Sequence, residues 1–136
     1  MPADAKAVVD LWRACGLVAV YNDPMADFHF ARGRGSSDVL VGEDAYGLCG
    51  SVMVGHDGHR GWLYYVASAP RARGRGVGRA MVEAAEGWLR ERDVVKLQLM
   101  VRETNEAVLS FYEHLGLEIT PRVVMAKWLV EPDHVA

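Results

Sequence analysis

The segment with the most evident chemistry is a run of alternating arginine and glycine. Residues 71–79 read Arg-Ala-Arg-Gly-Arg-Gly-Val-Gly-Arg, so four arginines and three glycines fall within nine residues. Glycine adopts the positive φ values of tight turns and leaves neighbouring N–H groups uncovered. Because a pattern of helical period follows directly, these N–H groups are expected at a helix N-terminus, where peptide dipoles favour an anion. The run predicts a phosphate or diphosphate site.

Two common phosphate motifs do not fit this run. A P-loop needs Gly-Lys followed by Ser or Thr, and a Rossmann fingerprint needs a last glycine where Arg79 or Met81 stands. The run does match the pattern Arg/Gln-x-x-Gly-x-Gly through Arg73, Gly76 and Gly78. A glycine-rich turn between a strand and a helix also fits a purely structural role, so a second motif has to decide between the two.

That second motif lies further along the chain. Asn105, Tyr112, Gly116 and Leu117 look like the pattern Asn-x-x-Ala-x-x-x-Tyr-x-x-x-Gly-Phe/Tyr/Leu. In order and separation, the two motifs resemble the GNAT N-acetyltransferase superfamily. Within it the chain is similar to the bacterial YpeA-like branch, from about Leu11 to the end, and this finer similarity is carried by residues 22–24, 57–61 and 64–65.

The resemblance implies a reaction as well as a fold. It implies an enzyme that takes acetyl-CoA as co-substrate, needs no metal, and transfers the acetyl group by direct attack of a primary amine on the thioester. The acceptor is a small molecule or a peptide whose identity the sequence leaves open. The alternative is a non-catalytic module that binds acyl-CoA as a sensor.

The cofactor-binding residues are also implied by the resemblance. In the family, pantetheine lies beside the strand that precedes the glycine loop, and the loop holds the diphosphate through its N–H groups. Asn105 matches a cofactor-contacting asparagine, although a helix N-cap explains an asparagine there equally well. The positions implied in this chain are Val66, Ala67, Ser68, Arg73, Gly74, Arg75, Gly76, Val77, Gly78, Arg79 and Asn105.

Tyr112 is the catalytic residue that the family motif implies. A phenol of pKa ~10 can donate a proton to the departing thiolate, whose acid has a pKa near ~8.5 by analogy with cysteine. The competing interpretation is that Tyr112 only packs beside Phe111. Asn22 and Asp23 are candidates for contact with the acceptor amine, and a capped turn before a short helix is the alternative for both.

The general base is where the chain departs from the family. Related peptide N-terminal acetyltransferases carry a glutamate where this chain has Met100. Glu103, His56 and Asp57 are possible substitutes acting through water, although a solvated surface role suits each of them better. His56 and His59 have no third metal ligand nearby in the sequence, so no metal site is predicted.

Periodicity predicts the elements that position these residues. The fold class is α/β, with a mixed, mostly antiparallel sheet, splayed central parallel strands and helices on both faces. Helices are expected over 5–15, after Pro24, and over 78–92 and 105–115, and strands over 38–43, 47–54, 62–67, 94–101, 117–120 and 122–130. The family's N-terminal edge strand is missing or shortened. An uncovered sheet edge favours pairing with residues 130–136 or with another chain, hence a possible homodimer.

Composition limits the remaining classes of function. The 136 residues carry 15 Lys and Arg against 18 Asp and Glu, and 51% are hydrophobic, as in one globular domain spanning 1–136. A net charge of −3 argues against nucleic acid as a partner, and no apolar run is long enough to cross a membrane. Cys15 and Cys49 fit no disulfide framework, which favours the cytoplasm.

Overall fold

The computed structural model describes residues 4–19, 22–102 and 104–131. The chain divides into two compact units, Met1–Leu99 and Met100–Ala136, and each is described by itself. That residues 1–136 form a single domain stays a prediction. No helix in the described part of the chain is both long and apolar enough to cross a membrane.

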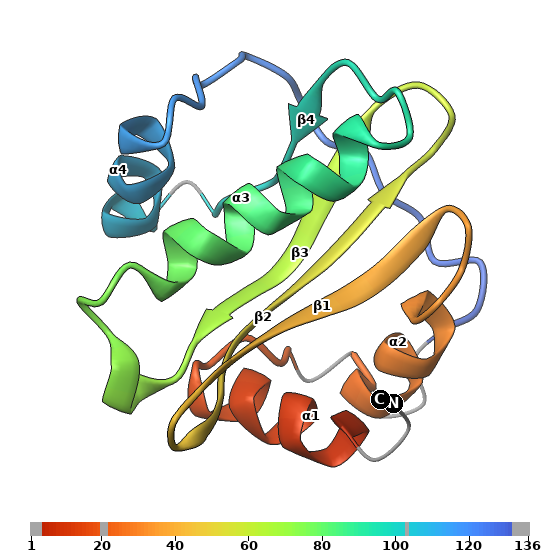
Figure 1. Cartoon of the computed structure of the whole chain (residues 1–136). Helices are drawn as coiled ribbons and strands as arrows, with labels where there is room; N and C mark the ends of the chain where they lie inside the picture. Colours follow the sequence, from red (N-terminus) through yellow and green to blue (C-terminus); the bar gives the residue numbers. More distant parts are fainter. Residues whose placement is uncertain (1–3, 20–21, 103, 132–136) are drawn as a thin grey trace. The chain divides into compact units, whose positions relative to one another are not determined.

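A four-stranded sheet forms the centre of the first unit (Figure 1). Its strands lie in chain order and are β1 (Ser37–Asp44), β2 (Gly47–His56), β3 (Gly61–Ser68) and β4 (Leu97–Gln98). The pairs β1–β2 and β2–β3 are antiparallel, whereas β3–β4 is parallel. This is the mixed sheet that the sequence predicts, and β1 and β2 form the expected hairpin.

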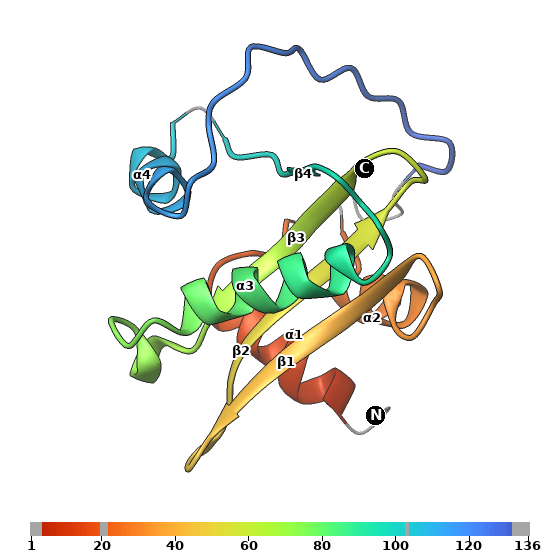
Figure 2. The same cartoon turned by 45° about the horizontal axis from the view of Figure 1, so that its top comes forward.

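Helices cover both faces of this sheet (Figures 1 and 2). The helices α1 (Asp4–Ala14) and α2 (Pro24–Ala31) lie on one face, and α3 (Val77–Arg90) lies on the other. A short 3₁₀ turn, η1 (Pro70–Ala72), joins β3 to the loop before α3. The α1, α2 and α3 helices confirm the predicted ones, and α1 ends before Gly16, whose φ is 68°.

Side chains on β2 alternate between these two helical layers. The Oγ of buried Ser51 accepts a hydrogen bond of 2.9 Å from the indole Nε1 of Trp12, which is fully buried on α1. Its neighbour Gly50 points the other way, because a β-carbon there would come within 2.6 Å of Val77 and 3.0 Å of Met81 on α3. A glycine at this position therefore lets α3 approach the sheet closely.

The alternation breaks at one place on β3. The pairing of β2 with β3 shifts between Ser51 and Met53, and Tyr65 has a φ of 52°, in the left-handed region that side chains normally avoid. Such a bulge re-aims the side chains beside it. As a result Tyr64 and Tyr65, which are consecutive, line the same pocket instead of opposite faces.

The second unit contains one helix, α4 (Glu106–His114), as the sequence predicts. The strands predicted over 117–120 and 122–130 are wrong, because no strand follows α4 within the described residues up to 131. The strand predicted over 94–101 is reduced to Leu97–Gln98. In each segment the apolar side chains match a strand pattern, but a strand also needs a hydrogen-bonded partner, which composition does not supply. Met125 and Leu129, for example, stay 91% and 92% exposed.

Candidate active site

The arginine and glycine run forms an open loop at the start of α3. Gly74 and Gly76 have φ values of 83° and 78°, and a β-carbon on either would meet nothing within 4 Å, so backbone conformation alone calls for glycine there. Gly76 is the N-cap of α3 and supplies no side chain to cap it. The first hydrogen bond inside the helix joins Ala80 N to Gly76 O, at 3.0 Å.

Three amides at this helix end therefore have no hydrogen-bond acceptor within the helix. The N–H groups of Val77, Gly78 and Arg79 have no acceptor among the described residues. They lie at the positive end of the helix dipole, so the loop offers donors of the kind that bind a phosphate oxygen. Gly78 lies in the first turn of α3 and has no positive φ, unlike Gly74 and Gly76.

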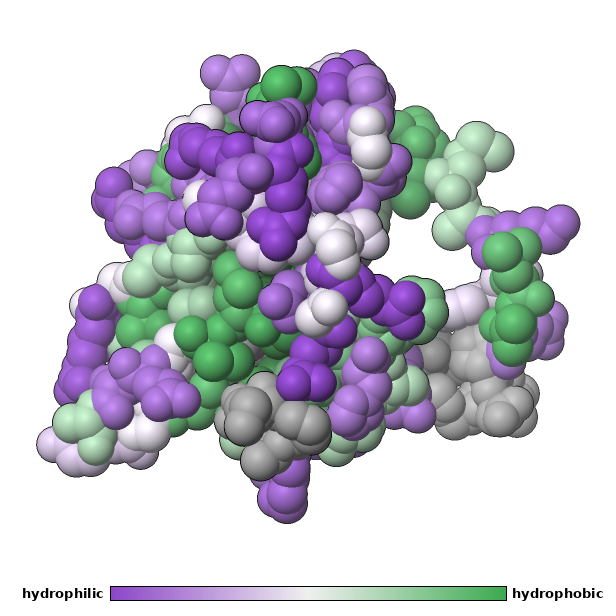
Figure 3. Space-filling model, turned by 45° about the vertical axis from the view of Figure 1, so that its right-hand side comes forward, coloured by the Kyte–Doolittle hydropathy of each residue, from purple (hydrophilic) through white to green (hydrophobic). Residues whose placement is uncertain are grey.

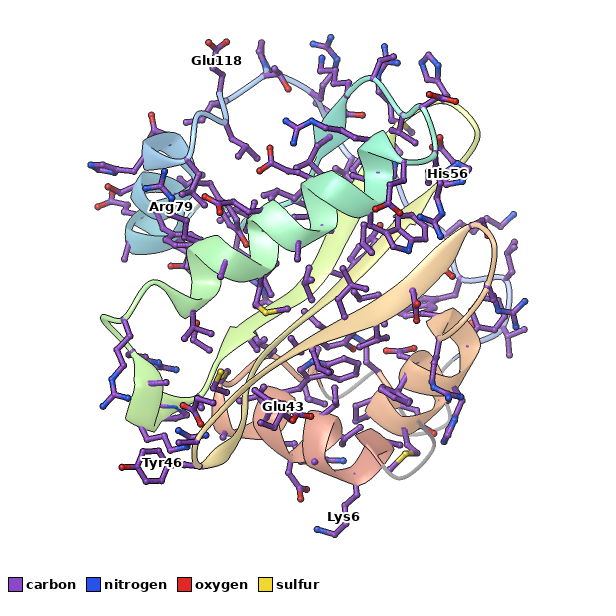
Figure 4. The ribbon with its side chains drawn as sticks, viewed as in Figure 1. Lys6, Glu43, Tyr46, His56, Arg79 and Glu118 are labelled. Carbon is purple, nitrogen blue, oxygen red and sulfur yellow. The ribbon has the colours of Figure 1, made fainter. Side chains whose placement is uncertain are left out.

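The arginines of the run have different partners. Arg71 donates from both terminal nitrogens to the carboxylate of Asp44, at 2.7 and 3.0 Å, and lowers the pKa of that carboxyl. It also donates to the carbonyl of Leu48, at 3.0 Å, and so anchors η1 to the β1–β2 hairpin. Arg79, labelled in Figure 4, pairs with Glu83 one turn along α3, at 3.0 Å. In the part of the chain that is described, the exposed Arg73 and Arg75 have no hydrogen-bond or ion-pair partner.

The strand leading into this loop has a bare edge. The parallel strand β4 pairs with β3 only at Gly61 and Trp62, so among the described residues no strand pairs with β3 beyond Trp62 on that side. On its other side β3 keeps its ladder with β2 as far as Ser68. The main chain of Val66, Ala67 and Ser68 thus has no strand partner among the described residues at the edge that faces away from β2, although the Ser68 carbonyl already accepts from the Cys15 thiol, at 3.1 Å.

The two remaining family positions lie in the second unit. Asn105 caps α4, because its Oδ1 accepts from the amide of Val108, at 3.4 Å. Tyr112 is half-buried, with its ring edge-on to Phe111 at a centroid distance of 5.0 Å. Burial raises the pKa of the Tyr112 phenol, so this hydroxyl keeps its proton at neutral pH.

The turn after β2 is less suited to supply a base. Asp57 accepts from the amides of His59 and Arg60 and from the indole of Trp62, and these bonds lower its pKa to about 2. A carboxylate that binds a proton so weakly is a poor base. Figure 4 shows His56 at the far end of β2 from Tyr46 at the hairpin tip, and Arg71 binds Asp44 at that tip. Glu103 lies outside the described residues, and Met100 is 52% exposed.

A pocket of about 430 Å³ opens beside β3, between the sheet and α2. Its polar lining consists of Asn22, Asp27, Tyr64 and Tyr65, and its apolar lining of Leu17, Phe30, Ala31 and Met53. Asn22 is thus one of the lining residues, and its contact with an acceptor amine stays a prediction. Asp23 is the N-cap of α2, accepting from Ala26 N at 3.1 Å, and is not part of the lining.

The sequence interpretation missed Asp27, Tyr64 and Tyr65 as lining residues. The Tyr65 hydroxyl donates to Oδ2 of Asp27, at 2.7 Å, across 38 residues of chain. A regular strand would place Tyr64 and Tyr65 on opposite faces, so only the bulge brings both to the pocket. The available signal was the consecutive pair of tyrosines, which regular alternation does not explain.

Within the described ranges, no group of three or more His, Cys, Asp or Glu side chains could hold a metal ion. On the face that Figure 3 draws, hydrophobic residues reach the surface between hydrophilic ones.

Comparison with known proteins identifies the family. Residues 5–117 match the Acetyltransferase (GNAT) family. An acetyltransferase from Pectobacterium atrosepticum is 40% identical over 128 residues, which cover 94% of this chain and 91% of that protein. Another from Yersinia enterocolitica is 38% identical, with the same coverage of both chains.

A solved structure is similar in fold. The aminoglycoside antibiotic 6'-N-acetyltransferase from Acinetobacter haemolyticus superposes with a TM-score of 0.78 over 95% of this chain and 94% of its own, at 15% identity. The family match over most of the chain, together with the bacterial relatives at about 40% identity, decides the assignment. The chain belongs to the GNAT family of acetyltransferases.

Proposed function

We propose that the protein transfers the acetyl group of acetyl-CoA to a primary amine by direct attack. The observation that carries this proposal is the bare edge of β3, which runs into three unpaired amides at the start of α3. An extended pantetheine arm can hydrogen-bond to a strand edge as a peptide would, and a diphosphate fits the helix N-terminus. The chain thus offers main-chain groups for the pantetheine amides and N–H donors for the diphosphate.

Residues of β3, of the loop and of the α4 N-cap would each bind a different part of acetyl-CoA. The main chain of Val66, Ala67 and Ser68 would bind the pantetheine amides. The N–H groups of Val77, Gly78 and Arg79 would bind the diphosphate, for which Gly74 and Gly76 set the turn. The guanidinium groups of Arg73 and Arg75 would bind a phosphate of the nucleotide. Asn105 would contact the cofactor in addition to capping α4.

Tyr112 acts as the general acid in this proposal. The amine nitrogen attacks the thioester carbonyl, the C–S bond breaks, and the sulfur leaves with the electron pair. Tyr112 donates its proton to that sulfur, and the attacking nitrogen loses a proton to water. Its raised pKa supports the role, because the phenol is protonated when the thiolate forms.

No carboxylate base is required if the amine is already partly neutral. An α-amine with a pKa near 8 is neutral in about 10% of molecules at pH 7, against far fewer for a lysine amine near ~10.4. The presence of Met100 where related peptide N-terminal acetyltransferases carry a glutamate is consistent with an acceptor amine of modest pKa.

We further propose that the chain belongs to the bacterial YpeA-like branch, that it acts in the cytoplasm, and that it can form a homodimer.

The test combines binding with turnover. Calorimetry should detect association of CoA with the protein, and thiol release from acetyl-CoA should depend on an added amine. Tyr112→Phe should lower kcat about 10²-fold while leaving CoA affinity nearly unchanged, because only proton donation in the transition state is lost.

The matched control is Tyr46→Phe, since Tyr46 is a 79% exposed tyrosine at the hairpin tip. Its kcat should equal that of the wild type. Unchanged turnover in Tyr112→Phe would remove Tyr112 from the mechanism, and the absence of CoA binding in the wild type would overturn the proposed function as a whole.

A further inference from the structure

The pocket beside β3 contains a carboxylate that the proposed reaction does not use. Asp27 lies in the first turn of α2, half-buried, and its Oδ2 accepts the hydrogen bond from Tyr65. Among the described residues Asp27 has no cationic partner and its Oδ1 has no donor. A carboxylate kept in a concave, largely apolar pocket without a cation is suited to receive one from a ligand.

The position of this carboxylate is fixed through Tyr65. The Tyr65 ring stacks on Trp12, with centroids 4.0 Å apart and planes 10° from parallel. Trp12 is itself fully buried and held by its bond to Ser51. The strained backbone of Tyr65, at φ 52°, is thus supported by packing and aims its hydroxyl at Asp27.

Aromatic rings complete the surroundings of Asp27. Phe30, one turn along α2, and Tyr64, next to Tyr65 on β3, also line the pocket, and the Arg34 guanidinium already lies over the Phe30 ring, 4.5 Å from its centroid. Ring faces attract cations through their quadrupole, and they stabilise the alkyl chain of an amine by apolar contact. One carboxylate among several aromatic rings therefore selects a positively charged group on an apolar body.

We propose that this pocket binds a second, non-reacting ammonium group of the acceptor, so that the preferred acceptors are diamines and larger polyamines. The inference rests on the proposed function and deepens it. The attacking amine has to be neutral, whereas a nearby carboxylate favours the protonated form of an amine. Asp27 therefore suits an amine that stays charged, and the reacting amine has to be another nitrogen of the same molecule.

The position of the pocket along β3 agrees with this division. Tyr64 and Tyr65 directly precede Val66, the first residue assigned to the pantetheine arm. The pocket thus lies beside the end of the bare edge that is farther from the phosphate loop, where the thioester end of the arm would point. Its volume of about 430 Å³ accommodates a flexible amine of several carbons.

The activity test compares two acceptors with the same carbon chain, the diamine cadaverine and the monoamine pentylamine. A charged hydrogen bond predicts that kcat/KM is about 10- to 100-fold higher for the diamine. Asp27→Asn should remove most of that preference by lowering the value for cadaverine alone. Tyr65→Phe keeps the ring that stacks on Trp12 and removes only the hydroxyl. Its kcat/KM for cadaverine should be about threefold to tenfold lower than that of the wild type, since a neutral hydroxyl contributes less than a carboxylate.

A binding test gives a readout that needs no turnover. Cadaverine is titrated calorimetrically into the protein saturated with CoA, which has no acetyl group to transfer. We expect binding to the wild type and an affinity about tenfold or more weaker for Asp27→Asn. Asp10→Asn is the matched control, because Asp10 is an exposed acid that pairs with Lys6 outside the pocket, and its affinity should equal that of the wild type.

The outcomes separate this inference from the proposed function. If CoA binds and both amines are acetylated equally well, the inference is wrong and the proposed function stands. If neither amine is acetylated, the titration decides: binding of cadaverine that depends on Asp27 supports the cation site, and equal binding to Asp27→Asn overturns it. If CoA does not bind at all, the proposed function fails independently.

Discussion

Two turns of the first unit are rich in glycine and basic residues, yet they use their polar groups in opposite ways. In the turn of residues 56–61, the amide of Gly58 donates to His56 Nδ1, at 3.2 Å, and the amides of His59 and Arg60 donate to Asp57. The loop of residues 71–79 leaves the amides that start α3 without an acceptor in the described part of the chain.

The difference arises from one side chain that can accept hydrogen bonds. The turn contains Asp57, whose carboxylate accepts hydrogen bonds from the amides of His59 and Arg60 and from the indole of Trp62. The loop contains no Asp, Asn, Ser or Thr that could do the same. A segment that satisfies its own donors is a structural turn, whereas a segment whose donors stay unsatisfied at a helix N-terminus is ready for an anion. This comparison separates the two roles better than glycine content does.

Among the variants of these two segments, the largest effect on CoA affinity should follow from adding a methyl group in the loop. Gly76→Ala places a β-carbon at a φ of 78°, a conformation that costs about 1–2 kcal/mol for such a residue. The loop can relieve this cost by turning its amides away from the diphosphate. Affinity for CoA, measured by calorimetry, should therefore fall about tenfold.

Gly58→Ala is the matched variant in the other turn. Gly58 has a φ of 84°, and a β-carbon there would also meet nothing within 4 Å, so the strain is comparable. This variant should lose stability without losing CoA affinity. An equal loss of affinity in both variants would mean that the two turns do not differ in function.

Much of this comparison could be predicted from the sequence. The arginine and glycine spacing identifies the loop, and helical periodicity identifies α1 and α3 to within a few residues, because burial of one helical face leaves a strong pattern. The strands expected after α4 failed because pairing depends on a partner elsewhere in the chain. Asp27 and Tyr65 could not be paired from the sequence, since a bulge and 38 residues of intervening chain decide their contact.

A smaller effect is expected from the arginine side chains of the loop. Arg73→Gln and Arg75→Gln should each weaken CoA binding by about threefold to tenfold at low salt, and by less as ionic strength rises, because exposed charges are screened. Arg60→Gln in the turn is the control, since Arg60 Nη1 already donates to the carbonyl of His59, at 3.1 Å. A loss in Arg60→Gln as large as in the loop variants would show only a general effect of net charge.

The smallest effect concerns the stability of the turn, and it has a defined pH dependence. The pKa of Asp57 is lowered from 3.8 to about 2 in the folded protein, first by the bond from the Arg60 amide. Its contribution to stability is therefore complete above 3.8 and is lost as the pH falls through about 2. Asp57→Asn should be less stable than the wild type at neutral pH, and the gap should close across that window.

Urea unfolding at a series of pH values measures this difference. Other carboxylates titrate in both proteins, so the change in the gap between them isolates Asp57. CoA affinity at neutral pH should be unchanged in Asp57→Asn, because the donors that Asp57 satisfies belong to the turn. If the gap kept the same size down to the lowest pH, the carboxylate charge would not be what closes the turn, and its contrast with the open phosphate loop would need another cause.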